Sequence, residues 1–145
     1  MPHLDFTTPL GILAFLPIVA FLKAGLPFGA AFPAAQLAVA LLLLPIVLYA
    51  VASRLSHRQA AVFGGGIFAL VLTLTYLQSS SGVTVAMHYN RWSWAVAFIA
   101  LLLAFLPPHD DLTARPKLDG ILIGVLTTAL LLTKVTFFVA LVPAM

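Results

Sequence analysis

The sequence predicts an all-α fold, a polytopic transmembrane helix bundle that forms a single domain over residues 1–145. Hydrophobic residues make up 63% of the chain, charged residues only 8%, and the mean hydropathy is +1.15. This composition is typical of an integral membrane protein. Long apolar runs alternate with short polar or proline-rich segments, and their lengths predict about four to five membrane helices.

The amino-terminal third of the chain predicts one short helix and one full span. Residues 9–22 are apolar, but Pro17 interrupts this run. It is also shorter than the roughly 20 residues that a span needs, so we expect a short or interfacial helix. Glycine and proline residues punctuate residues 24–33 and predict an irregular connection. Residues 34–53 predict a spanning helix, which Pro45 is expected to kink.

The middle of the chain predicts two further spans. Residues 54–58 form a charged turn, and residues 60–77 are expected to return across the membrane. Three consecutive glycines at 64–66 should face another helix, because small residues let neighbouring backbones approach closely. Residues 92–106 predict the next span.

The last span is predicted at residues 120–142, after a charged connection at 107–119. Three acidic residues lie in this connection next to basic ones: Asp110, Asp111 and Asp119. We expect these carboxylates to be solvated and not to bind a cation.

The basic residues orient this bundle. Four of the seven Lys and Arg residues lie in the turns at 54–58 and 107–119. By the positive-inside rule, these two turns face the cytoplasm. Asp5 and Arg91 then lie together on the opposite side of the membrane.

A polar and aromatic stretch precedes the span at 92–106. It contains an imidazole, a phenol, an amide, a guanidinium and two indoles, from His88, Tyr89, Asn90, Arg91, Trp92 and Trp94. Trp and Arg at the start of a span are typical of an aromatic belt with an interfacial anchor. The alternative is a binding surface where the membrane meets water.

Lys134 lies within the apolar run at 120–142. Ionisable groups inside a membrane helix are costly and usually face a cavity or a partner. In a continuous helix that starts at Gly120, Lys134 would lie about 21 Å along the axis. Its ammonium could then snorkel to the face that carries Asp5 and Arg91. Lys134 is therefore either an interface anchor or part of a site on that face.

Three stretches carry a resemblance to a known family. They are Asp5-Phe6-Thr7-Thr8-Pro9-Leu10-Gly11, the basic turn Arg54-Leu55-Ser56-His57-Arg58-Gln59-Ala60-Ala61, and the late run from Gly120-Ile121-Leu122-Ile123-Gly124 to Leu132-Thr133-Lys134. Together they resemble the GT-C membrane glycosyltransferases, which transfer sugars from polyprenyl-phosphate donors. The resemblance implies sugar transfer on the non-cytoplasmic face of a multi-pass protein, at the bacterial inner membrane.

The resemblance also implies roles for individual residues. Asp5 matches the family's catalytic acid and would act as a general base for the acceptor hydroxyl or as a metal ligand. The expected substrate-binding residues are His88, Tyr89, Asn90, Arg91 and Lys134. The two cations among them would neutralise the lipid phosphate. The cofactor requirement is unknown, and the sequence leaves open whether the site binds a divalent cation.

The chain departs from this family in its extent. Such enzymes have a membrane helix before the acidic loop and many more spans. We therefore expect an amino-terminal portion of a larger membrane protein, or the product of a truncated or split gene. Its expected partners are the lipid bilayer, the polyprenyl-phosphate sugar and the remainder of that protein, and catalysis by this portion alone is not expected.

Two other function classes stay open. One is a non-catalytic small membrane subunit. The other is a transporter module lined by Lys134 and proline-kinked helices, although the chain has no inverted repeat. The scattered basic residues argue against a nucleic-acid partner. The absence of cysteine excludes disulfides and thiolate zinc sites, and the four histidines lack the spacing of a helical metal pair.

Overall fold

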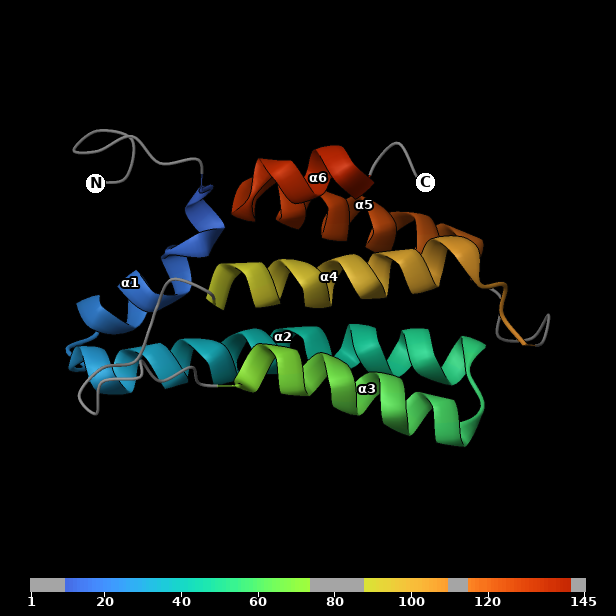
Figure 1. Ribbon diagram of the computed structural model, residues 1–145, viewed down its shortest axis with the longest axis horizontal. Helices are drawn as coiled ribbons and strands as arrows, with labels where there is room; N and C mark the ends of the chain where they lie inside the picture. The colour runs from blue at the N-terminus through green and yellow to red at the C-terminus, as the bar shows by residue number, and fades with distance from the viewer. Residues whose placement is uncertain (1–9, 74–87, 110–114, 142–145) are drawn as a thin grey trace.

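The computed structural model describes residues 10–73, 88–109 and 115–141, which form a bundle of helices (Figure 1). These residues form one 3₁₀ helix and six α-helices: η1 (Ile12–Ala14), α1 (Leu16–Lys23), α2 (Phe28–Arg54), α3 (His57–Leu72), α4 (His88–Phe105), α5 (Pro116–Thr133) and α6 (Val135–Leu141). Within the described residues, β structure is limited to an isolated bridge between Leu10 and Lys134. The all-α prediction is confirmed.

Helices α2, α3, α4 and α5 lie side by side with nearly aligned axes, and the short α1 crosses one end of them (Figure 1). The helix α2 packs on α3, α3 on α4, and α4 on α5. Val47, Ile67, Ile99 and Leu126 lie in the core of this bundle, each at most 2% exposed. Burial of each such side chain stabilises the fold by about 1.5–3 kcal/mol.

The amino-terminal helix α1 has eight residues. At 1.5 Å per residue it is about 12 Å long, which is too short to cross a hydrocarbon core of about 30 Å. The structure thus has a short helix where the sequence predicted one at 9–22, with η1 directly before it. Helix α1 packs across the first turns of α2, whereas η1 packs against α5.

The first long helix, α2, begins earlier than the sequence predicted. It starts at Phe28, directly after Pro27 in an extended conformation (ψ 153°). The irregular connection predicted at 24–33 is therefore wrong beyond Pro27. Pro33 and Pro45 both lie inside α2, because neighbouring helices in an apolar bundle can re-satisfy the backbone groups that a proline leaves unpaired.

Helix α3 begins with a capping box. The Oε1 atom of Gln59 accepts hydrogen bonds from the Ser56 amide at 3.0 Å and from the Ser56 hydroxyl at 2.8 Å. Such a box satisfies donors that the first helical turn leaves unpaired. Helix α3 ends at Leu72, and the predicted span at 60–77 extends past the described residues from position 74 onward.

The three glycines of α3 do not share one environment. A Cβ atom on Gly64 would lie 3.8 Å from Cγ1 of Val47 on α2, whereas Cβ atoms on Gly65 and Gly66 would meet nothing within 4 Å. The expected contact with another helix is therefore correct for Gly64 and wrong for the other two. A helix buries only one side against its neighbour, so three consecutive residues cannot all face it.

Two boundaries in the second half of the chain correct the sequence prediction. Helix α4 begins at His88, so the polar residues 88–91, which were expected to precede the span at 92–106, form its first turn. Helix α5 begins at Pro116 and ends at Thr133, so the uninterrupted span predicted at 120–142 is wrong.

The chain reverses its direction at Lys134. This residue is extended, with φ −159° and ψ 109°. The following helix α6 folds back beside α5 and runs along α4 (Figure 1). Accordingly, Trp94 of α4 meets Phe137 of α6, with ring centroids 5.0 Å apart.

Among the described residues, two helices are long and apolar enough to cross a membrane, α2 and α5. Large apolar side chains also point outward from all four long helices, among them Leu42, Val62, Phe105 and Ile121, which are 57–78% exposed. Exposed apolar surface of this kind is typical of contact with a membrane or with another protein. Length and composition thus indicate membrane spanning for two of the predicted helices.

Candidate functional site

The candidate site lies where the start of α4 meets the turn between α5 and α6. The Nζ atom of Lys134 donates a hydrogen bond to Oδ1 of Asn90 at 2.8 Å. The same ammonium lies 5.4 Å from the ring centroid of Tyr89 and 5.6 Å from that of Phe137. An amide oxygen and two aromatic faces together stabilise a cation that is partly removed from water. Three of the five expected substrate-binding residues are therefore in contact.

The reversal at Lys134 aims its side chain at α4. The Gly11 amide donates a hydrogen bond to the Thr133 carbonyl at 3.0 Å, and Leu10 forms an antiparallel bridge with Lys134. The end of α5 is thus paired with the segment that precedes η1. Because residues 10 and 11 occupy this side of the turn, the Lys134 side chain extends toward the first turn of α4.

His88, the first residue of α4, is buried. Its Nε2 atom lies 2.8 Å from the carbonyl oxygen of Ala14 in η1. A carbonyl can only accept, so Nε2 carries the proton of this hydrogen bond. The ring also makes edge-on contacts with Phe32 and Trp92 and is only 1% exposed. His88 therefore anchors η1 on α4, and its expected part in substrate binding stays a prediction.

Arg91 lies one residue beyond Asn90, within about 1.5 Å of it along the helix axis. Its Nε and Nη2 atoms are buried and have no hydrogen-bond partner among the residues that the structure describes. Leaving a buried charged donor unpaired costs at least about 1–3 kcal/mol. These two nitrogens are the donors of a guanidinium fork, which suits a bidentate bond to a carboxylate or a phosphate.

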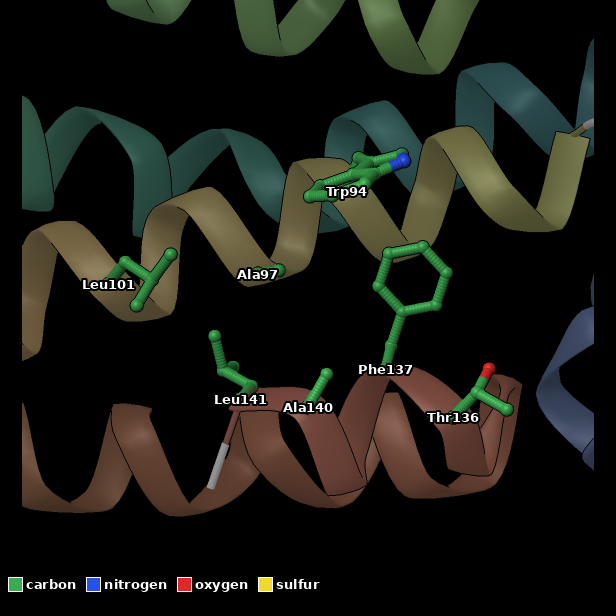
Figure 2. Close-up of a pocket in the computed structure, with 7 residues that line it drawn as sticks. All are labelled: Trp94, Ala97, Leu101, Thr136, Phe137, Ala140 and Leu141. Atoms are coloured by element: carbon green, nitrogen blue, oxygen red, sulfur yellow. The ribbon is translucent and has the colours of Figure 1, made fainter. Parts of the chain in front are cut away.

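An apolar groove of about 350 Å³ lies between α4 and α6. It is lined by Trp94, Ala97 and Leu101 of α4 and by Thr136, Phe137, Ala140 and Leu141 of α6 (Figure 2). The Phe137 ring lines this groove and also lies next to the Lys134 ammonium. The apolar groove and the Lys134 ammonium are therefore adjacent, with Phe137 between them.

A second polar cluster lies at the opposite end of the bundle. Arg54, only 2% exposed at its side chain, forms a salt bridge with Asp119 at 2.8 Å between Nη2 and Oδ2. The other Asp119 oxygen accepts a hydrogen bond from the Tyr49 hydroxyl at 2.7 Å. Arg54 also donates to the Leu106 carbonyl at 2.9 Å and to the Ser53 hydroxyl at 2.6 Å. This cluster connects α2, the end of α4 and the first turn of α5.

The structure therefore corrects the prediction that Asp119 is solvated. Its carboxylate is 16% exposed and pairs with a buried guanidinium. Both residues border predicted spans on the same side and carry opposite charges, so the sequence held a signal for this pair. Asp110 and Asp111 lie outside the described residues.

Charge is distributed unequally between the two ends. Among the described residues, Asp119 is the one acidic residue, and it forms a salt bridge with Arg54. Within the described ranges, Lys134 and Arg91 thus have no carboxylate partner. Asp5, the expected catalytic acid, lies outside those ranges. The described residues also include no group of three His, Asp or Glu side chains that could hold a metal ion.

No family model matches the chain, and no curated protein or solved structure is significantly similar to it.

Proposed function

We propose that the chain is a multi-pass membrane protein that binds a lipid-linked phosphate beside Lys134 and Arg91, as part of a GT-C type glycosyltransferase that uses a polyprenyl-phosphate sugar. The helices α2, α3, α4 and α5 would span the bilayer, and α1 would lie at the interface. The basic turns at 54–58 and 107–119 would face the cytoplasm under the positive-inside rule. The site would then open to the non-cytoplasmic face.

The observation that carries this proposal is the unpaired fork of Arg91. A buried guanidinium without a partner favours binding of an anion that can accept two parallel hydrogen bonds. Lys134 adds a second cation at the same end of α4. A phosphate offers both the charge and the oxygens that these two side chains need.

The groove between α4 and α6 favours a lipid as the carrier of that phosphate. Its lining is apolar, and Phe137 connects it to the Lys134 ammonium. A hydrocarbon chain in the groove would bury apolar surface at about 25 cal/mol per Å². A free phosphate would use the cations but leave the groove empty.

Asp5 would supply the base for sugar transfer. The acceptor oxygen would bond to the anomeric carbon while the bond from that carbon to the phosphate oxygen breaks. The acceptor proton would move to the Asp5 carboxylate. The leaving phosphate would keep the electron pair, and Arg91 and Lys134 would stabilise its added charge.

Binding of a polyprenyl monophosphate to the chain in phosphatidylcholine nanodiscs tests this proposal. Arg91→Gln and Lys134→Gln should each weaken binding about 10–100-fold, because each removes a charge-assisted hydrogen bond worth about 1.5–3 kcal/mol. Arg58→Gln, at an exposed position in the opposite turn, is the matched control and should bind like the unchanged chain. Equal affinities in all four proteins would overturn the proposal.

A second candidate is a non-catalytic membrane subunit. Lys134 already has an amide partner and two ring faces, which suffice to hold a partly buried ammonium without a ligand. In that case Lys134→Gln would lower the stability of the bundle and leave lipid affinity unchanged. Comparing thermal unfolding with binding in the same variants separates the two candidates.

A further inference from the structure

The reversal at Lys134 is not encoded by the residues around it. The stretch Leu130-Leu131-Leu132-Thr133-Lys134-Val135-Thr136-Phe137-Phe138 contains neither glycine nor proline. These two residues are the usual causes of a helix end or a sharp turn. Taken alone, the stretch favours a helix that continues from α5 into α6, so tertiary contacts must hold the turn.

The contact that replaces the helical hydrogen bond comes from Gly11. In a continuous helix the Thr133 carbonyl would accept from the Phe137 amide, four residues later. Instead, the Gly11 amide donates to Thr133, and the Phe137 amide donates to the Lys134 carbonyl at 3.0 Å. The Gly11 amide thus competes with the Phe137 amide for one carbonyl.

Space allows only glycine at position 11. A Cβ atom there would lie 2.0 Å from the Leu132 carbonyl oxygen and 2.4 Å from its carbon. Gly11 has φ −76° and ψ 171°, which any residue can adopt. The glycine is therefore required for the close approach of two backbones and not for its conformational freedom.

We infer that Gly11 is a positioning residue: by capping the Thr133 carbonyl it holds the reversal at Lys134, and without it α5 and α6 join into one membrane-length helix. Such a helix from Pro116 to Leu141 would be roughly 40 Å long, whereas α5 alone is roughly 27 Å. The hydrocarbon core is about 30 Å thick. Both forms are compatible with a bilayer, so the contact with Gly11 decides between them.

His88 helps to hold the segment that carries Gly11 in place. Its hydrogen bond to Ala14 fixes η1 on α4, three residues after Gly11. The reversed form places the Lys134 ammonium on Asn90 and α6 along the groove. A continuous helix would carry α6 away from α4 and remove the groove. Only this consequence for lipid binding rests on the function proposed above.

Distances between two spin labels test the inference directly. The chain has no cysteine, so Lys117→Cys and Val139→Cys, both at exposed positions, provide the only labelling sites. At 1.5 Å per residue the labelled positions are about 18 Å apart along the axis in the reversed form and about 33 Å in a continuous helix. Gly11→Ala should move the distance distribution from the short to the long value. Gly65→Ala, where a Cβ meets nothing within 4 Å, is the matched control and should keep the short distance.

A rescue variant separates this effect from unfolding. Val135 is the first residue of α6, a position that favours proline, and proline there prevents a helix from continuing through Lys134. Val135→Pro in the Gly11→Ala background should therefore restore the short distance. An unchanged distribution in Gly11→Ala, or a short distance that Val135→Pro fails to restore, overturns the inference. Neither measurement uses a ligand, so a failure of lipid binding alone counts only against the proposed function.

Discussion

The side chains of Arg54 and Lys134 are both partly removed from water, but in different ways. Each of the three guanidinium nitrogens of Arg54 has a partner: the Asp119 carboxylate, the Ser53 hydroxyl and the Leu106 carbonyl. Lys134 has one amide oxygen and two aromatic rings. The first arrangement neutralises its charge within the protein, and the second leaves a net positive charge. This difference separates a structural cluster from a candidate binding site.

The cluster around Arg54 should therefore stabilise the fold and have no part in ligand binding. Asp119→Ala leaves a buried guanidinium without its counter-charge and should lower the free energy of unfolding by about 3–5 kcal/mol. Denaturant unfolding in detergent micelles measures this change. Lys117→Gln, an exposed charge in the same turn of α5, should change it by less than about 0.5 kcal/mol. A loss as small in Asp119→Ala as in Lys117→Gln would show that the salt bridge stabilises nothing.

At the scale of a helix, α3 shows how one turn can separate a packed residue from open ones. Gly64 is buried against Val47, while Gly65 and Gly66 are exposed. The exposed face also carries Val62 at 78% exposure. Cβ atoms on Gly65 and Gly66 would meet nothing within 4 Å, so this side of α3 is open at both positions.

Leucine substitutions should discriminate these glycines. Gly64→Leu forces a side chain into the contact with α2, and overpacking of this kind costs about 1–3 kcal/mol. Gly65→Leu points into open space and should stay within about 0.5 kcal/mol of the unchanged chain. Unfolding of both variants in the same detergent gives the comparison. Equal losses at 64 and 65 would contradict the packing of α3.

For the whole molecule, the two polar clusters mark its two ends. Arg54 and Asp119 lie at the end of α2 and the start of α5, whereas Asn90 and Lys134 lie at the start of α4 and the end of α5. If the bundle spans the bilayer, these ends face opposite compartments. Under the topology proposed above, the Arg54 end would face the cytoplasm.

Single cysteines test this orientation. Ser56→Cys, in the turn between α2 and α3, and Ala24→Cys, directly after α1, are both at exposed positions. In sealed vesicles of known sidedness, a membrane-impermeant thiol reagent should label them from opposite sides. Labelling of both from one side would contradict a spanning α2.

The sequence predicted the class of this fold and much of its helix content, because both follow from local properties. Apolar composition and the length of apolar runs indicate membrane helices without knowledge of any contact. The sequence also singled out Tyr89, Asn90 and Lys134, since polar groups in an apolar chain are conspicuous. It placed α2, α4 and α5 with errors at their starts, where helices extended into polar or proline-containing sequence.

What the tertiary structure decided are the features that depend on residues far apart in the chain. Local sequence favours one helix through Lys134, and only the approach of Gly11 to Thr133 and Leu132 shows that the chain turns back there. The sequence predicts that Asp119 is solvated, whereas the structure pairs its carboxylate with Arg54. The sequence does not show that His88 contacts the carbonyl of Ala14, 74 residues away. A carbonyl, a carboxylate and an imidazole each have a fixed chemistry, but their roles depend on which partner the fold brings within hydrogen-bond distance.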